Sequence, residues 1–485
     1  MTDKTIDGEF FKEPSKNSVT RDIADIVGWI LSVILPLSIY LFTPPIEIDG
    51  FGNEPKLFLC VLSSAGVMWT FSLLPEFIPG IFVLLSTLLL SLVDSPVVLS
   101  GFSSPTFTTV LSIIAMTMVI IDSGVMKRFL LYLLRHVHSP CLAGWVLFGF
   151  GSLITPILPS IISRAQLLGP LVKDISKPFE SEKDPQNRTF LFANGFYGLS
   201  LLSSSFLSAS LLNFIVLSLL PLQEQEQFQS QGWFKGALVI TVVLLFFYFL
   251  ILPIFFGTGK KSQKTGKTLT FSNDQTKRIQ AKEVVSLGVL LTFFVGTLTS
   301  NYHRIPSSWL AFLAFFLLLV FGFIQIDDFR KKIDWPYLFF LSSIVGISST
   351  FKTMGLDLWL YNNFLTFIPE ILNDKLTLFG AITAVTLILR LVLPVGAVVT
   401  LLIPTALAIA TKVGVSGWSV SIVLLFVADI WFFPYQCTFY QIYRSDFEGS
   451  GISEKRFLLS NAALSLVKIL ALFLSIYYWK YLSLI

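Results

Sequence analysis

The residues best placed to do chemistry lie in an apolar stretch that three prolines interrupt, residues 154–170, ITPILPSIISRAQLLGP. The stretch carries Ser160, Ser163 and Arg164. Proline removes a backbone donor and clashes with the preceding turn, so the stretch cannot form one uninterrupted membrane helix. Irregular backbone at membrane depth occurs where it is buried in protein or lines a watery cavity, and an arginine there indicates a functional site. The stretch therefore predicts a re-entrant hairpin that carries a binding site.

A second break lies at residues 393–404, LPVGAVVTLLIP, in a corresponding place of the second half. In the first half, Pro159 lies 159 − 124 = 35 residues after Gly124. In the second half, Pro394 lies 394 − 355 = 39 residues after Gly355, so the two spacings are similar. Paired interrupted segments in two halves are the best sequence indication of the midplane site of a secondary transporter. Chance similarity between apolar stretches is the alternative.

Further polar residues lie in otherwise apolar segments. Ser208 and Asn213 could line a pore, although small residues also allow helices to pack closely. Gln436 follows a proline and is a candidate substrate donor, with helix packing as the alternative. Arg390 is either a substrate contact or one partner of an ion pair with Asp429 or Asp122. Asp429 itself is either a proton or cation site, or a hydrogen-bonded buried carboxylate.

These breaks are embedded in a polytopic membrane protein. The chain has 485 residues, of which 54% are hydrophobic and 13% charged, and its mean hydropathy is +0.76. We count about eleven membrane crossings of roughly 18 to 20 residues, plus two re-entrant hairpins. The expected divisions are a tail (1–25), a first half with an interfacial helix (26–256), a basic loop (257–283) and a second half (284–485). The three cysteines form neither a disulfide framework nor a metal spacing.

The distribution of basic residues predicts the orientation. Loop 257–283 holds seven lysines and arginines, whereas loops 94–106 and 223–231 hold none. Basic residues collect beside the cytoplasmic ends of membrane helices, so the N-terminus is expected inside. The first 25 residues lack the pattern of a signal peptide. We expect a multi-pass protein of a bacterial plasma membrane, with the lipid bilayer but no nucleic acid as a partner.

Five motifs occur in order along the chain: GFSSPT (101–106), SGVMKR (123–128), PS..SRA....P (159–170), FLSASLLN (206–213) and FPYQ (433–436). Together they resemble the divalent anion:sodium symporter family. The nearest likeness is to its 2-oxoglutarate/malate translocators and citrate/succinate antiporters. The resemblance implies a homodimer of protomers with a scaffold domain and a transport domain that moves as an elevator.

The resemblance also implies which residues bind substrate. Each hairpin tip of the family bears a Ser-Asn-Thr-like motif that binds a substrate carboxylate and helps to form a sodium site. Here the first motif falls on Ser160, two isoleucines, Ser163 and Arg164. The second falls on Gly396 and its neighbours Ala397 and Thr400. Substrate contacts are thus expected at these positions, with candidate sodium sites near Ser160 and Gly396.

The isoleucine and valine side chains at the tips cannot hydrogen-bond a substrate carboxylate, so backbone groups, half-helix N-termini and Arg164 are expected to bind it. The prediction is a secondary transporter of di- or tricarboxylate-like anions such as malate, 2-oxoglutarate, succinate or citrate, operating by exchange and without a cofactor. The alternatives are a sodium- or proton-coupled symporter of another anion, and a non-transporting regulatory paralogue. An enzyme is not expected, because the sequence offers no nucleophile with a base and no metal cluster.

Overall fold

The computed structural model describes residues 18–485, except 47, 49, 136, 138, 178–184, 258–280, 300–302, 304, 357–358, 360–373, 392 and 394. The helices of its first half are α1 (Ser18–Phe42), α2 (Glu54–Thr70), α3 (Phe77–Leu89), α4 (Ser95–Val98), α5 (Pro105–Ser123), α6 (Val125–Leu134), α7 (Pro140–Ile154), α8 (Ile161–Ser176), α9 (Pro185–Ser200), η2 (Leu207–Ala209), α10 (Leu211–Leu219), α11 (Leu222–Gln227) and α12 (Ser230–Phe256). Those of the second half are α13 (Ala281–Leu298), α15 (Ser307–Val320), α16 (Ile326–Lys331), α17 (Trp335–Thr353), α19 (Lys375–Arg390), α20 (Val395–Val413), α21 (Gly417–Ala428), η5 (Pro434–Gln436), α22 (Thr438–Ser445) and α23 (Glu454–Tyr481).

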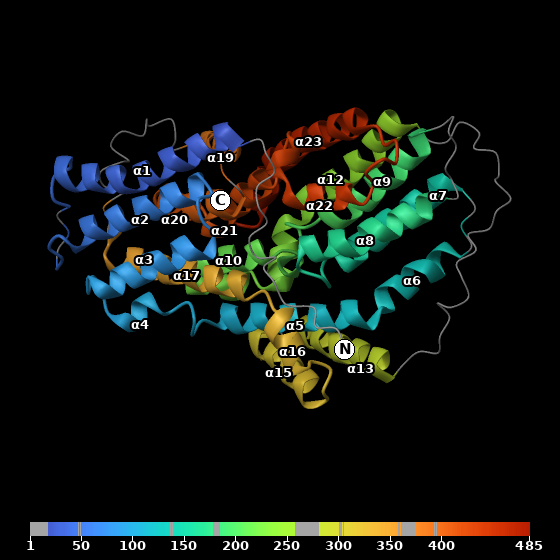
Figure 1. The fold of residues 1–485 in the computed structure, drawn as a ribbon, viewed down its shortest axis with the longest axis horizontal. Coiled ribbons are helices and arrows are strands. Elements are labelled where there is room, and N and C mark those ends of the chain that lie inside the picture. The colour runs from blue at the N-terminus through green and yellow to red at the C-terminus, as the bar shows by residue number, and fades with distance from the viewer. Residues whose placement is uncertain are drawn as a thin grey trace.

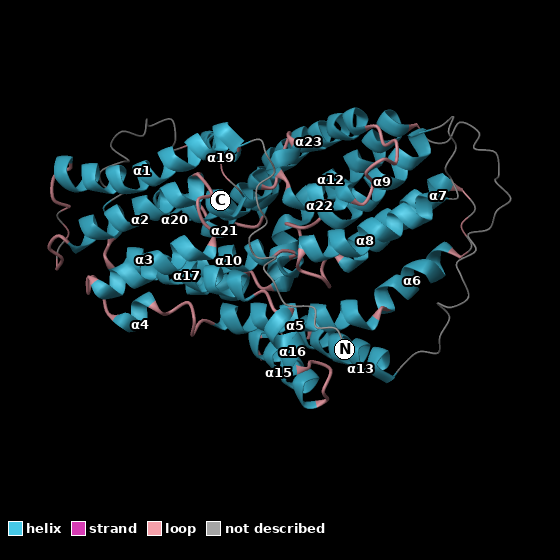
Figure 2. Ribbon diagram, viewed as in Figure 1, coloured by secondary structure: helices cyan, strands magenta, loops and turns pink. Residues whose placement is uncertain are grey.

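The described residues form helices and no named strand (Figure 2), so the all-α prediction is confirmed. In the part of the chain that the structure describes, four helices contain apolar windows long enough to cross a bilayer: Asp25–Phe42, Pro105–Ser123, Ser230–Phe256 and Glu454–Tyr481. Shorter apolar helices, among them Phe77–Leu89 and Gly417–Ala428, accompany them. The total of about eleven crossings stays a prediction.

Two buried apolar clusters lie along the long axis of the molecule. One gathers residues of α2, α3, α5, α10, α13, α15, α17 and α19–α21, and the other gathers residues of α6–α9 and α22. Figure 1 shows α1, α2, α3 and α17 towards one end and α7, α8 and α9 towards the other. Helices α12 and α23 contribute to both clusters and therefore join the two ends.

Serine and proline at the start of helices explain where several of them begin. Ser104 precedes α5 and Ser139 precedes α7; each side chain accepts a hydrogen bond from an amide of the first turn, and a proline follows at once. This pairing satisfies an otherwise free donor and fixes the first backbone angle. At the end of α5, Gly124 adopts the left-handed conformation (φ 69°), so the chain turns there into α6.

Both proline-broken stretches interrupt helices, although not over their full predicted length. The first gap, residues 155–160, separates α7 from α8, and the second, between Arg390 and Val395, separates α19 from α20. Pro170 and Pro404, predicted as part of the breaks, instead lie inside α8 and α20. The arms of the hairpins are thus longer than the sequence suggested. The tail also begins its helix earlier than predicted, at Ser18.

The predicted interfacial helix after Gly124 is α6, which buries Met126, Leu130 and Leu134 along one face. Residues 356–371, which follow Gly355 in the corresponding place of the second half, fall almost wholly outside the described residues, as does most of the basic loop 257–283.

Candidate functional site

A cavity of about 410 Å³ lies where both hairpin tips meet two unwound segments. One unwound segment connects α9 to α10, and the other connects α21 to α22. We call this space the central cavity. Its lining is Ser72, Glu76, Ile161, Ile162, Ser203, Ser204, Ser210, Leu212, Asn213, Arg390, Leu393, Val395, Gly396, Leu425, Asp429, Tyr435, Gln436, Cys437, Thr438 and Phe439.

Four helices begin at the wall of the central cavity. Ile161 is the first residue of α8 and Val395 the first of α20, while Ser210 and Cys437 are the N-caps of α10 and α22. The N-terminus of a helix carries the equivalent of roughly +0.5 charge and unpaired backbone amides. Because four such ends meet at one cavity, the cavity can attract an anion even though the hairpin tips carry few polar side chains.

Arg164 fastens the first hairpin tip to the α9–α10 segment. It is fully buried. Its Nη1 donates to the carbonyl oxygens of Thr155 (2.7 Å), Leu158 (2.8 Å) and Ala209 (2.9 Å), and its Nη2 donates to Ser203 Oγ (3.0 Å). The guanidinium group thus binds protein oxygens and lies behind the cavity wall. In this conformation it positions the tip, whereas the sequence predicted a substrate contact.

Arg390 makes the equivalent connection at the second tip. It donates to the carbonyl oxygens of Leu393 (2.8 Å) and Gln436 (3.0 Å). Gln436 returns a hydrogen bond to the Arg390 carbonyl (2.7 Å), and its side-chain oxygen accepts from the amides of Phe432 (2.8 Å) and Phe433 (3.0 Å). Gln436 therefore holds the α21–α22 segment in place while it lines the cavity.

These contacts bear on whether sodium fits at the tips. A hard cation needs several free oxygen ligands. The carbonyls of Thr155, Leu158 and Leu393 already accept from guanidinium groups, and a fixed positive charge beside them repels a second cation. The described oxygens at both tips are consequently a poor fit for sodium.

Two carboxylates and a lysine complete the charges around the cavity. Asp429, at the end of α21, pairs with Lys468 of α23 (Oδ2 to Nζ 2.6 Å). The carboxylate of Glu76 lies against the second tip, 3.4 Å from where a Cβ on Gly396 would be. Asp429 thus pairs with Lys468, and Asp122 pairs with Lys332, whereas the sequence had suggested either carboxylate as a partner of Arg390. Glu76, Asp429 and Arg390 line the cavity itself, whereas Lys468 and Arg164 lie outside its lining.

The structure brings some of the predicted site residues together. Asn213, Gly396 and Gln436 all line the central cavity. The Asn213 amide group donates to the carbonyls of Ser203 (2.9 Å) and Phe206 (2.8 Å), which shapes the unwound segment. The side chains of Ala397 and Thr400 lie outside the described residues.

Other predicted residues line separate spaces. Ser160 caps α8 by accepting from the Ser163 amide (3.2 Å), and both line a neighbouring cavity of about 420 Å³ that Asp122 and Lys332 also border. The hydrogen bonds that Lys332 donates to the carboxylates of Asp122 and Asp328 raise its pKa there. Ser208 borders a third cavity, together with residues of α5 and α12.

Sequence reasoning missed Glu76 and Lys468. Lys468 lies in the apolar run SLVKILALF, and a lone charge within a membrane helix is a signal that could have identified it. Glu76 lies in the short link between α2 and α3, where a carboxylate is unremarkable until the fold brings it to the hairpin tip.

Two re-entrant hairpins, two unwound helices and a cavity between them define a helical membrane transporter. The fold is shared with the YdaH transporter of Alcanivorax borkumensis, with a TM-score of 0.52 and 11% identity over 95% of this chain and 98% of that one.

Residues 24–485 match the sodium:sulfate symporter transmembrane region, so the chain belongs to the divalent anion:sodium symporter family. The resemblance drawn from the motifs is confirmed, and the chain is a membrane transporter and not an enzyme.

Curated relatives are distant. The putative malate transporter YflS of Bacillus subtilis is 23% identical over 72% of this chain and 74% of its own. The inner membrane protein YbhI of Escherichia coli is 22% identical over 54% of this chain and 56% of its own. The L-tartrate/succinate antiporter of E. coli is 20% identical over 49% and 50%. The chain thus spans only about half the length of the last two.

Proposed function

We propose that the protein exchanges organic anions of the di- and tricarboxylate class across a bacterial plasma membrane without coupling to sodium. The observation that carries the proposal is the convergence of four helix N-termini on the central cavity, beside Arg390. Charge-assisted hydrogen bonds from such groups are the interactions that a carboxylate needs when it leaves water. The names of YflS and of the tartrate/succinate antiporter support the substrate class.

Independence from sodium follows from the arginines. Arg164 and Arg390 supply positive charge at the two tips and bind the carbonyl oxygens that a cation would otherwise use. The positive charge that balances an anionic substrate therefore stays with the protein. The empty binding site would carry this charge unbalanced through the membrane, so the site returns only with a second anion bound, and the result is exchange.

The proposal includes the motion and the assembly expected from the sequence. Two protomers form a homodimer, the N-terminus faces the cytoplasm, and the hairpins move with α9, α10, α21 and α22 as an elevator. Light scattering of the purified protein in detergent tests the dimer: a monomer mass would contradict it.

Counterflow into proteoliposomes tests the exchange. Vesicles loaded with malate should take up labelled malate, 2-oxoglutarate, succinate or citrate equally well in sodium and in choline medium, and empty vesicles should not. Uptake that needs sodium or a proton gradient and no internal anion would favour the symporter. Absence of any saturable flux would favour a non-transporting paralogue.

A further inference from the structure

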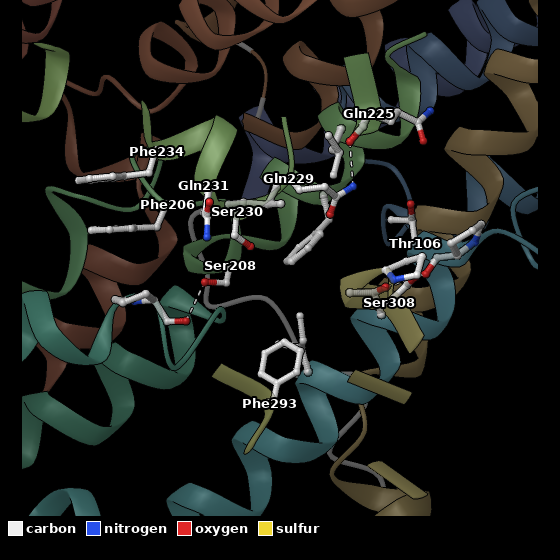
Figure 3. A pocket seen from close by; sticks show the side chains of 18 residues that line it. Thr106, Phe206, Ser208, Gln225, Gln229, Ser230, Gln231, Phe234, Phe293 and Ser308 are labelled. Carbon is white, nitrogen blue, oxygen red and sulfur yellow. Dashed lines mark hydrogen bonds between the residues drawn. The ribbon is translucent and has the colours of Figure 1, made fainter. Parts of the chain in front are cut away.

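A second cavity, of about 350 Å³, lies between α5, α13 and α15 on one side and η2, α10, α11 and α12 on the other. We call it the amide-lined cavity, because Gln225, Gln229 and Gln231 border it (Figure 3). Its volume is within the range of small-molecule sites. Among the described residues that line it, none is an aspartate, glutamate, lysine, arginine or histidine.

Aromatic rings and neutral polar groups divide the lining. Figure 3 shows Phe206 and Phe234 side by side on one wall, where their rings stack with centroids 5.0 Å apart. Phe293 forms part of another wall. The hydroxyls of Thr106, Ser230 and Ser308 also border the space and have no partner among the hydrogen bonds of the described residues. An occupant would thus meet apolar surface and a few groups that donate or accept one hydrogen bond each.

The charge of the occupant follows from this lining. A buried charge without a counter-ion is very costly, whereas a neutral amide, ester or hydroxyl needs only one or two hydrogen bonds. The anions of the central cavity are thereby excluded. From this lining we propose that the amide-lined cavity binds an uncharged amphiphile, a molecule with an aromatic or aliphatic body and one neutral polar group.

The same geometry connects this cavity to transport. The unwound α9–α10 segment separates the two spaces: Ser203, Ser204 and Ser210 face the central cavity, and Phe206 and Ser208 face the amide-lined cavity. Ser208 donates to the Pro156 carbonyl (2.8 Å), within the tip that Arg164 holds. A bound amphiphile therefore packs on the back of the anion site and wedges between helices that must separate, so it inhibits exchange. This inhibition rests on the proposed function, whereas the binding does not.

Protection of an introduced cysteine measures the binding. Ser230→Cys places a thiol in the cavity, Cys141→Ser removes the partly exposed native thiol, and N-ethylmaleimide reports access in detergent. The probe is 4-propylbenzamide, and 4-propylbenzoate has the same shape with a charge. At ten times its Kd the amide should slow labelling about tenfold, and the benzoate should bind at least about tenfold more weakly.

Two variants control for indirect effects. Ser103→Cys, exposed and outside the cavity lining, should label at the same rate with or without the amide. Ser308→Phe fills the cavity and should abolish the protection of Ser230→Cys by the amide. Equal protection by benzamide and benzoate, or protection that survives Ser308→Phe, would overturn the proposal.

Two sources could supply such an amphiphile, and the same assay separates them. Monocaprin, an uncharged glycerol ester that partitions into membranes, represents lipid, and the benzamide represents a soluble ligand. Protection by either supports the site, and protection by neither overturns it. In proteoliposomes the effective probe should lower the maximal exchange rate without changing the apparent affinity for malate. If a probe protects Ser230→Cys from labelling but the unmodified protein exchanges no anion, the binding site is supported and the proposed function is refuted.

Discussion

Replacement of Arg164 by alanine should convert a sodium-independent exchanger into one that sodium assists. The substitution removes a cation that binds three carbonyl oxygens and Ser203 Oγ inside the protein. Each acceptor left unsatisfied and buried costs about 1 kcal/mol or more, so four of them cost about 4 kcal/mol. The space left by the guanidinium is then walled by oxygens, which are the ligands that sodium prefers. We expect exchange in choline medium to be lost and partly restored in sodium.

Two measurements check this expectation. The free energy of unfolding, from titration with sodium dodecyl sulfate, should fall by about 4 kcal/mol in Arg164→Ala and by less than about 1 kcal/mol in Arg444→Ala, whose side chain is half exposed and pairs with Glu454. Malate counterflow of both variants is then compared in sodium and in choline. If Arg164→Ala is as stable as Arg444→Ala, or if its exchange is lost in both media, the reasoning that the guanidinium replaces a cation is refuted.

Three further predictions concern packing and charge in the fold. Gly101→Ala would drive a Cβ into the backbone of α17, whereas Gly149 has open space; we expect a loss of about 2 kcal/mol or more in unfolding free energy for the first and almost none for Gly149→Ala. Glu224→Gln removes the charge that accepts from the first two amides of α21 (2.9 and 2.7 Å), and should cost about 1 kcal/mol in the same titration. The double variant Asp429→Asn/Lys468→Met should lose less unfolding free energy than the sum of the losses of the two single variants, with a coupling of about 1 to 3 kcal/mol in a double-mutant cycle. Additive effects would show that the pair is not coupled.

Much of the fold could be predicted because it depends on local rules. Apolar runs separated by polar links indicate membrane helices, and proline excludes a continuous helix, which located both hairpin tips. The rule failed at Pro170 and Pro404, which lie inside α8 and α20. A proline inside a helix removes one backbone donor and clashes with the preceding turn. Contacts with neighbouring helices can satisfy the freed carbonyl group, so the helix continues.

The site was less accessible to sequence reasoning, because its contacts join residues far apart in the chain. The carbonyl of Ala209 that Arg164 binds lies 45 residues away, and that of Gln436 lies 46 residues from Arg390. Periodicity can assign a residue to a helix face, but it cannot say which unwound segment packs there. For the same reason Ser160 and Ser163 were predicted in the substrate site, and the structure places them at the neighbouring cavity.

The placement of the two arginines explains how isoleucine and valine can occupy the tips. At each tip the first arm ends with the negative pole of its helix and the second arm begins with the positive pole. Arg164 belongs to the second arm but reaches back to carbonyls at the end of α7, and Arg390 belongs to the last turn of α19 and binds the carbonyl just beyond it. Both guanidinium groups therefore neutralise the end of the first arm. The positive poles of α8 and α20 remain at the cavity wall, so an anion can be bound there without the polar side chains that the family motif supplies.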